Sequence, residues 1–527
     1  MTDRTVSDLL VAGLEAEGVE HVFGLPGEET EDVLFSLRDS DVAFVPCRHE
    51  QGAAFMADVH GRLTGAAGVC LSTLGPGATN LLTGVADAHL DKSPVVAVTC
   101  QGGLERLHHE SHQALDVLDL FEPVTKWNAQ LNDPAIVHES VRKAFKLAEL
   151  EKPGVTHLEL PEGVAGEPTD DRPFAAPEPV PDPRPNADAL AAAADLFRAA
   201  DRPLVLAGNG AVRARAADEL RRLVEVTDVP VVSTFMGKGA VSDEDPRSLM
   251  TLESGDGAAM DAVREADLVV ALGYDVAEHD PGDWLPPDAP LVHADSEAAE
   301  VYHDYDPDVE VVADVARTVA ELADALADAT TAGTDWYADY REAVRSAVAP
   351  DDDPEPPFAV AEVLPLLREA MAPADVLISD VGAHKMAIAR HYPTYEPNTC
   401  VISNGLASMG IAVPGALAAD LAVDANVVAA TGDGGFLMNA AELETATRVG
   451  CGYTVVVFNN DEYGIVADHQ REHRGESVGT DLTNPDLVRF AESFGIEGRR
   501  AESAAELRDA LDLVDRDEMA LVEVPVT

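Results

Sequence analysis

Apolar residues in this chain occur mainly in short, nearly continuous runs that are rich in β-branched side chains. Examples are VVAVTC (95–100), PLVLAG (203–208), ADLVVALG (266–273), NVVAATGD (426–433) and TVVVFNN (454–460). Segments with a helical spacing of apolar residues separate these runs. Strands that are buried on both faces of a parallel sheet show this continuous pattern, because helices cover both faces. The pattern therefore predicts an α/β protein in which strands and helices alternate.

Two segments rich in proline and acidic residues divide the chain into three parts of similar size. These segments, DRPFAAPEPVPDPRPN (171–186) and APDDDPEPP (349–357), contain few large apolar residues, which is typical of linkers. A chain of 527 residues also exceeds what one core usually holds. We therefore expect three doubly wound parallel-sheet domains, at residues 1–170, 187–348 and 358–527.

The composition adds an extreme negative charge. Thirty-six Lys and Arg residues against 96 Asp and Glu residues give a formal net charge of −60. Such a surface repels phosphate backbones and anionic lipids, so we expect no nucleic-acid partner and no membrane partner. The acidic residues are spread along the chain, which favours a cytoplasm rich in salt, where the Debye length falls to about 3 Å near 1 M.

The N-terminus and the cysteines both favour a cytoplasmic protein. The sequence MTDRTVSDLL lacks the basic start and apolar run of a signal peptide. No apolar stretch approaches the roughly 20 residues that span a bilayer. The chain has five cysteines and no CxxC spacing, which argues against a disulfide framework and against a structural zinc site.

The third segment carries a predicted metal and phosphate site. The run NVVAATG leads into Gly432, Asp433, Gly434 and Gly435, and the run TVVVF leads into Asn459 and Asn460. Asp and Asn side chains supply the hard oxygen ligands that Mg²⁺ prefers. The glycines let the backbone approach a phosphate, and the helix that follows favours an anion at its N-terminus. Either half of this pattern alone is a common turn.

A second candidate residue lies in the first segment. The run VAFVPC leads into Arg48, His49 and Glu50, and small residues follow. A carboxylate near a helix N-terminus is common, so this position alone does not assign a function to Glu50.

Together these motifs resemble the signature of thiamine-diphosphate enzymes, in which GDG precedes an Asn pair by a fixed interval. Here 24 residues, 435–458, separate them. The resemblance implies that Asp433 and Asn460 bind Mg²⁺ through side chains and that Glu462 binds it through its carbonyl oxygen. It also implies that Glu50, in RHEQGAAFMA, protonates the cofactor's aminopyrimidine ring. The three domains would then be pyrimidine-binding, middle and diphosphate-binding.

Across nearly the whole chain the resemblance is closest to acetolactate synthases, especially the catabolic type without FAD. It rests on segments such as GVEHVFGLPG (18–27), LGPGATNLLTGVADAH (74–89), SHQALD (111–116) and YEPNTCVISNGLASMGIAVPGALAADL (395–421). This resemblance implies that pyruvate loses CO₂ and that its two-carbon fragment joins a second pyruvate as acetolactate. The partners would be small 2-oxo acids. The active sites would lie at the subunit interface of a homodimer or homotetramer.

The same resemblance implies roles for further residues. Gln113 would face the reacting 2-oxo acid, and Met409 would hold the bent cofactor between its two rings. The remaining predicted cofactor contacts fall into two groups. Those at the diphosphate are Gly382, Ala383, His384, Gly434 and Gly435, and those along the cofactor are Tyr463, Gly464 and Ile465.

We expect no FAD. Biosynthetic relatives that bind FAD carry an Arg-Phe-Asp-Asp-Arg pattern in the middle domain, where this chain reads GYDVAEHDP (273–281). The run from Gly208 to Arg213 also lacks the third glycine of GxGxxG. The tryptophan that favours 2-oxobutyrate in those relatives aligns with His469, which favours pyruvate as the acceptor.

Three alternatives remain open. A simple 2-oxo-acid decarboxylase would use a paired-histidine motif to protonate the fragment left after CO₂ departs, and His108 and His109 fit such a motif. A different carboligase, acting on glyoxylate or an aldehyde, is a second alternative. Glyoxylate carboligases have an apolar residue in place of Glu50, which counts against that member. The third is a cofactor-binding relative without catalytic activity.

Overall fold

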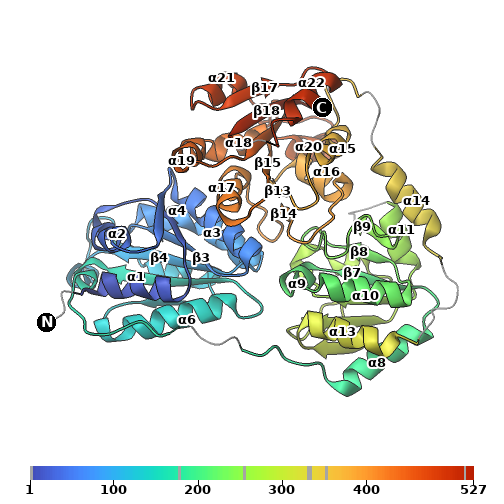
Figure 1. Ribbon diagram of the computed structural model, residues 1–527, viewed down its shortest axis with the longest axis horizontal. Helices are drawn as coiled ribbons and strands as arrows, with labels where there is room; N and C mark the ends of the chain where they lie inside the picture. The colour runs from blue at the N-terminus through green and yellow to red at the C-terminus, as the bar shows by residue number, and fades with distance from the viewer. Residues whose placement is uncertain (1–3, 176–179, 253–256, 329–334, 350–353, 516–517) are drawn as a thin grey trace.

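In the computed structural model, three α/β domains follow one another along the chain (Figure 1). The structure describes residues 4–175, 180–252, 257–328, 335–349, 354–515 and 518–527. Parts of both predicted linkers, residues 176–179 and 350–353, lie outside these ranges. Each sheet falls within one of the three predicted segments, whose limits remain a prediction. The predicted class, three doubly wound parallel-sheet domains, is confirmed.

The first domain contains a six-stranded parallel sheet in the order β2-β1-β3-β4-β6-β5. Helices pack on both faces of this sheet, as the continuous apolar strands require. The strands are β1 His21–Gly24, β2 Ala43–Pro46, β3 Gly68–Ser72, β4 Val95–Gln101, β5 Trp127–Gln130 and β6 Val155–Pro161. The helices are α1 Val6–Ala16, α2 Glu31–Arg38, α3 Glu50–Thr64, α4 Pro76–Leu90, α5 Val117–Phe121, α6 Val137–Glu149 and α7 Glu162–Ala165.

The middle domain has a different strand order, β12-β11-β10-β7-β8-β9. Counted within the domain this is 6-5-4-1-2-3, the order of dinucleotide-binding folds. The strands are β7 Pro203–Ala207, β8 Val231–Ser233, β9 Ser248–Thr251, β10 Leu268–Leu272, β11 Leu291–Asp295 and β12 Val309–Val312. The helices are α8 Ala187–Ala199, α9 Asn209–Arg213, α10 Ala217–Thr227, α11 Ala258–Glu265, α12 Pro281–Trp284, α13 Val315–Leu326 and α14 Ala338–Ala347.

The third domain repeats the topology of the first. Its strand order is β14-β13-β15-β16-β18-β17, which within each domain corresponds to 2-1-3-4-6-5. The strands are β13 Val376–Ser379, β14 Cys400–Ile402, β15 Val427–Gly432, β16 Thr454–Asn459, β17 Glu497–Arg500 and β18 Ala520–Pro525. The helices are α15 Val360–Ala370, α16 Ala383–His391, α17 Ala412–Ala422, α18 Asp433–Asn439, α19 Glu442–Val449, α20 Gly464–Arg474, α21 Leu487–Glu492 and α22 Ala504–Leu511.

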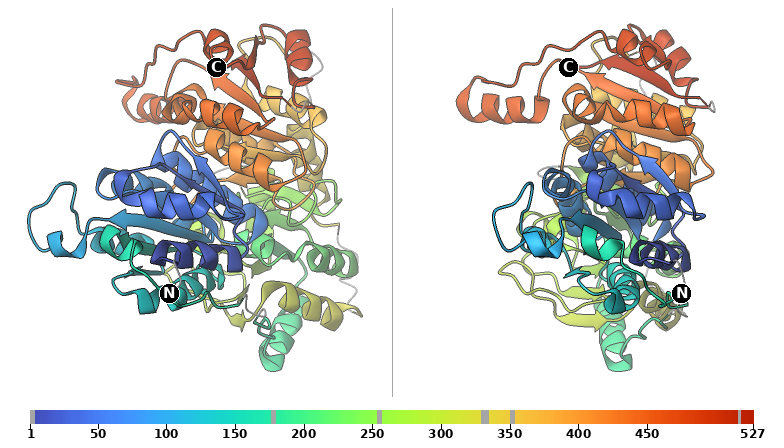
Figure 2. Two further views of the ribbon diagram at one scale, coloured as in Figure 1. Left: turned by 60° about the vertical axis from the view of Figure 1, so that its left-hand side comes forward. Right: turned by 90° about the vertical axis from the view of Figure 1, so that its left-hand side faces the viewer.

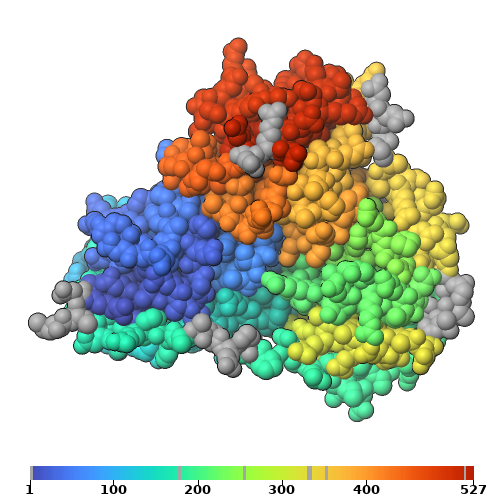
Figure 3. All heavy atoms as spheres, in the orientation of Figure 1, coloured from blue at the N-terminus to red at the C-terminus, as the bar shows by residue number. Residues whose placement is uncertain are grey.

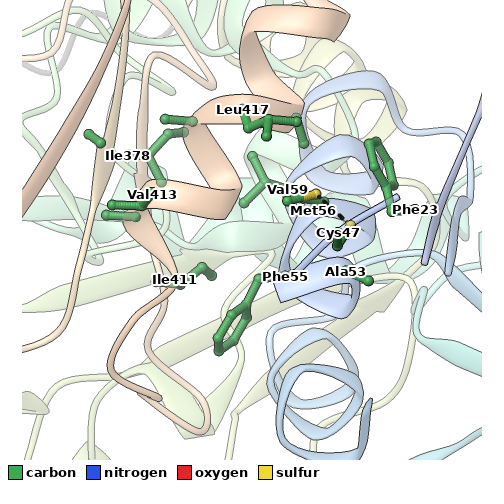
Figure 4. Close-up of a cluster of buried hydrophobic side chains, with 14 of the residues drawn as sticks. Phe23, Cys47, Ala53, Phe55, Met56, Val59, Ile378, Ile411, Val413 and Leu417 are labelled. Atoms are coloured by element: carbon green, nitrogen blue, oxygen red, sulfur yellow. Dashed lines mark hydrogen bonds between the residues drawn. The ribbon is translucent and has the colours of Figure 1, made fainter. Parts of the chain in front are cut away.

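The first and third domains share one hydrophobic core. Helix α3 packs against α17, and Figure 4 shows Val59 of α3 on the side that faces Val413 and Leu417 of α17, with Phe55 toward Ile411. A shared core of this kind fixes the relative position of two domains, because packed side chains tolerate little displacement. The space-filling view shows all three domains in contact with their neighbours (Figure 3).

None of the helices in the described part of the chain combines the length and apolar character that a bilayer crossing requires. All five cysteines are buried and free.

Candidate active site

A pocket lies at the carboxyl ends of β13, β15 and β16 in the third domain. The strand order reverses between β13 and β15, and doubly wound sheets bind their ligands at such a point. The residues that line the pocket include every predicted metal and cofactor residue of this domain: Gly382, Ala383, His384, Met409, Asp433, Gly434, Gly435, Asn460, Glu462, Tyr463, Gly464 and Ile465. Residues as far apart along the chain as Gly382 and Ile465 are therefore brought to one site.

Three helices begin at this pocket. Helix α16 starts at Ala383, α18 starts at Asp433 and α20 starts at Gly464. The first backbone N–H groups of a helix have no partner within the helix, and the helix dipole is positive there. The convergence of three N-termini therefore favours an anion such as a diphosphate.

Two glycines let the loops approach closely. A Cβ on Gly434 would lie 2.6 Å from Cε1 of Tyr463, and a Cβ on Gly435 would lie 2.9 Å from Oδ1 of Asp380. Both distances are shorter than the closest non-bonded approach of a Cβ atom to another heavy atom. A larger residue at either position would move the GDG turn away from the pocket.

Asp433 is 2% exposed at the first position of α18. Its Oδ2 accepts a hydrogen bond from Nδ2 of Asn484 at 2.6 Å. Burial raises the pKa of Asp433, and the bond from Asn484 acts in the opposite direction. The carboxylate is therefore placed by a residue that lies outside both halves of the metal motif.

The side chain of Glu462 is already occupied. Its carboxylate pairs with Arg471 at 2.6 Å and accepts a bond from Oγ1 of Thr480 at 3.0 Å. Within the described residues, no group of three His, Cys, Asp or Glu side chains is arranged to hold a metal. A metal here would therefore need the mixed donor set of an Asp carboxylate, an Asn amide oxygen and a backbone carbonyl. This set suits Mg²⁺, which takes oxygen ligands and keeps several waters.

His384 supplies an independent observation that a ligand belongs here. The side chain is 5% exposed, and among the described residues its Nε2 atom has no hydrogen-bond partner. Burial lowers the pKa of His384 to about 4, so the ring is neutral. A buried polar atom without a partner is costly, and a phosphate oxygen would satisfy it. The residues present therefore fit a diphosphate bound through Mg²⁺.

Asp380 supports the loops that line the pocket, and the sequence did not single it out. It is fully buried after β13, and its carboxylate accepts backbone bonds from Val381 at 2.7 Å and from Gly410 at 2.8 Å. Thr431 donates to the same carboxylate at 3.1 Å. These bonds hold the loop that carries Met409 beside the loop that carries Gly382. The only sequence signal was an acidic residue at the end of an apolar strand.

Glu50 begins α3 at the carboxyl edge of the first sheet and is 4% exposed. Its Oε2 accepts a hydrogen bond from Nδ2 of Asn80 at 2.9 Å. A Cβ on Gly77 would lie 3.3 Å from its Oε1. Among the described residues that line the third-domain pocket, neither Glu50 nor Gln113 occurs. Within one chain, neither of these two predicted catalytic residues lines this pocket.

Gln113 and the histidine pair lie on an exposed loop of the first domain. The loop between β4 and α5 stands out from the molecule (Figure 2). Gln113 is exposed and has a positive φ of 55°, and the rings of His108 and His109 contact edge to face at 4.6 Å. The Gln113 backbone packs on Gly75, because a Cβ there would lie 2.6 Å from the Gln113 carbonyl oxygen. The loop thus lies on the same edge of the first sheet as Glu50.

The switch point of the middle domain is closed by its own chain. The backbone N–H of Gly210 donates to the carbonyl of Gly273 at 2.8 Å, which joins the loops after β7 and β10. The N–H of Asn209 at the start of α9 donates to Oε1 of Glu278 at 3.0 Å. A carboxylate therefore already occupies the helix start that would face a dinucleotide's diphosphate in this type of fold.

Three family descriptions match the chain, one in each domain. Residues 4–120 match the thiamine pyrophosphate enzyme N-terminal TPP binding domain, residues 190–322 match the central domain, and residues 380–524 match the C-terminal TPP binding domain. The chain belongs to the thiamine-diphosphate-dependent decarboxylase and carboligase family, and it is an enzyme of that family.

Individual relatives are similar over almost the full length. The chain is 34% identical to a probable acetolactate synthase large subunit of Methanocaldococcus jannaschii, over 96% of this chain and 89% of the relative. It is 34% identical to the acetolactate synthase of Bacillus subtilis, over 99% of this chain and 93% of the relative. It is also 34% identical to a catabolic acetolactate synthase of Raoultella terrigena, over 99% and 94%. Because all three identities are 34%, identity alone does not separate catabolic acetolactate synthases from the other relatives.

Proposed function

We propose that this enzyme is an acetolactate synthase that converts two pyruvate molecules into acetolactate and CO₂. The observation that carries the proposal is the third-domain pocket, which contains all twelve predicted metal and cofactor residues of that domain. The names of the relatives support acetolactate as the product. When bound, thiamine diphosphate supplies a nucleophilic carbon and accepts the electrons left as CO₂ departs.

The chain's own residues have defined tasks in this proposal. Asp433, Asn460 and the Glu462 carbonyl bind Mg²⁺, while the N–H groups of Gly434 and Gly435 approach the diphosphate. Glu50 holds a proton at the aminopyrimidine ring, and Met409 wedges the cofactor into its bent form. Apolar side chains around the pocket, including Ile465, exclude water and so favour loss of the substrate's carboxylate charge.

The site is completed by a second copy of the chain. Glu50 and Gln113 lie outside their own chain's pocket, so the proposed chemistry requires them from a partner. Large apolar side chains are exposed both around the pocket and on the first-domain edge, and such surfaces mark interfaces. They are Leu406, Leu437, Met438, Ile465 and Val466 in the third domain and Leu104, Leu115 and Leu120 in the first. We propose a homodimer, or a tetramer of such dimers.

The proposal includes no FAD. The N–H groups of Asn209 and Gly210, which would face a diphosphate at the middle-domain turn, already donate to Glu278 and Gly273. These occupied N–H groups support assignment to the acetolactate synthases that lack FAD.

The exposed pair His108 and His109 favours one rival, the simple decarboxylase, because imidazole donates protons near neutral pH. The two functions differ in product. The purified chain would be incubated with pyruvate, thiamine diphosphate and Mg²⁺ at high salt, with and without 2-oxobutyrate. Acetolactate supports the proposal, and acetaldehyde as the main product overturns it in favour of the rival. A mixed product with 2-oxobutyrate would assign a broader acceptor range.

A further inference from the structure

Helix α19 of the third domain contacts the turn of the first domain that leads into Glu50. The Oε1 atom of Glu442 accepts backbone hydrogen bonds from Arg48 at 3.0 Å and from His49 at 3.0 Å. Its Oε2 atom accepts from Arg48 N at 3.2 Å and from Oγ1 of Thr445 at 2.6 Å. One carboxylate therefore joins segments that are 394 residues apart in the sequence.

The groups around the Glu442 carboxylate replace the water that it loses on burial. Glu442 is 0% exposed, and a buried charge is tolerated only where hydrogen bonds replace the lost water. Its partners are two backbone N–H groups and one hydroxyl. A Cβ on Gly52 would lie 2.8 Å from Oε1 of Glu442, so the glycine at this position leaves room for the carboxylate.

Two further contacts from the same helix reach the same turn. Arg448 donates to the carbonyl of Pro46, and the guanidinium of Arg48 lies 3.6 Å from the carboxylate of Glu444. Helix α19 thus holds residues 46–49 along their whole length. This turn ends at His49, the N-cap of α3, and Glu50 is the first residue of that helix.

The geometry points to Glu442 as a positioning residue for Glu50. Glu442 fixes the two N–H groups directly before Glu50 and so sets the place and direction of the Glu50 carboxylate. This inference rests on the proposed function of Glu50 at the cofactor. A displacement of about 1 Å at a catalytic group can cost on the order of a hundredfold in rate, so such a contact controls turnover without touching the substrate.

Amide hydrogen exchange on the full chain, without cofactor and at high salt, tests the contact itself. Bonds to a charged acceptor are among the stronger ones, so Glu442→Ala should speed exchange at Arg48 and His49 by about tenfold to a hundredfold. Glu442→Gln keeps one oxygen acceptor and should give a smaller increase. Glu149→Gln is the matched control, because Glu149 accepts a backbone bond from Ala67 at 3.1 Å, elsewhere in the first domain. Unchanged exchange in Glu442→Ala would overturn the inference.

Turnover separates positioning from general stability. Below the melting transition, Glu442→Ala should lower turnover of pyruvate by about a hundredfold while thiamine diphosphate and Mg²⁺ bind within about twofold of the wild-type affinity. Loss of turnover only in proportion to lost cofactor or lost folded protein would overturn the inference. If Glu442→Ala does not fold, the same comparison applies to Glu442→Gln, with an expected loss of about tenfold.

The variant Glu50→Gln separates a failure of this inference from a failure of the proposed role of Glu50 at the cofactor. Normal turnover in Glu50→Gln would overturn the proposed role of Glu50, and the positioning role with it. Low turnover in Glu50→Gln together with normal turnover in both Glu442 variants would overturn the positioning role alone.

Discussion

The side-chain nitrogen of Asn484 lies 2.6 Å from Oδ2 of Asp433 and 2.9 Å from Oδ1 of Asp461. One amide thereby bridges two carboxylates that repel each other. The segment that carries Asn484 runs back along the loop that follows β16, where Leu482 N donates to the carbonyl of Asp461 at 2.7 Å. Asn484 therefore sets the orientation of Asp433 before any metal binds.

Replacing Asn484 by Ala should weaken Mg²⁺ binding. Partners that orient a metal ligand typically contribute about tenfold to a hundredfold in affinity, so a loss of this size is expected. Calorimetric titration with Mg²⁺ in the presence of thiamine diphosphate measures it. Asn426→Ala is the control, since Asn426 bonds Asp375 at 3.3 Å away from the pocket. Equal affinities in the two variants would contradict the assignment.

Asp433→Ala should abolish retention of the cofactor. The variant loses the only charged side-chain ligand of the proposed Mg²⁺ site, and the diphosphate then lacks its counter-ion. Dialysis followed by measurement of bound thiamine diphosphate tests this outcome. Retention equal to that of the wild-type protein would remove Asp433 from the metal site.

Glu50→Gln should retain the cofactor and lose activity. Positioned proton transfer contributes about 10² to 10⁴ in rate, and glutamine cannot hold the required proton. Turnover of pyruvate at saturating thiamine diphosphate and Mg²⁺ measures the loss. The same dialysis experiment as for Asp433→Ala provides the control, with retained cofactor as the expected result.

Asp58 should make stability depend on pH. It is fully buried in α3, and this burial raises its pKa to about 7. Between about pH 4 and 7 the unfolded chain releases this proton while the folded chain keeps it, so stability falls as pH rises through this window. Above pH 7 the loss is complete.

Asp58→Asn should remove this loss. The variant should be more stable than the wild-type protein at pH 8 by about 1–3 kcal/mol, and the advantage should shrink toward pH 4. Melting temperatures at fixed salt across this range measure the effect. Asp512→Asn, at an exposed position after α22, is the control and should leave the melting temperature unchanged at both pH 4 and pH 8. A constant difference at all pH values would contradict the assigned pKa.

Lower salt should destabilise the folded protein. The net charge of −60 produces self-repulsion that salt screens, since the Debye length grows from about 3 Å at 1 M to about 10 Å at 0.1 M. The melting temperature should therefore fall on dilution from 2 M to 0.1 M KCl. A melting temperature that does not depend on salt would contradict adaptation to a salt-rich cytoplasm.

Local patterns predicted the strands and the sheet edge at Asp433 and Asn460, while the other pocket residues were named from the family resemblance. Neither indicated the contacts that support the pocket. The apolar runs before Asp433 and Asn459 indicated adjacent parallel strands. The two strands, β15 and β16, do pair in parallel, so their carboxyl ends lie at the same edge of the sheet. Glu442 and Asn484 carry no local signal, and Asp380 carries only a weak one, an acidic residue at the end of an apolar strand. Each of the three gains its role from a partner distant in sequence. Buried polar pairs of this kind depend on tertiary packing, which periodicity does not encode.

The separation of Glu50 from its own chain's pocket has a consequence for mixed assemblies. A chain with Glu50→Gln still offers an intact pocket, and a chain with Asp433→Ala still offers an intact acid. If the two inactive proteins exchange subunits at random, half of the dimers pair unlike chains, and each such dimer regains one of its two sites. Mixing two dead enzymes would then restore about one quarter of the wild-type activity, whereas a site built within one chain would restore none.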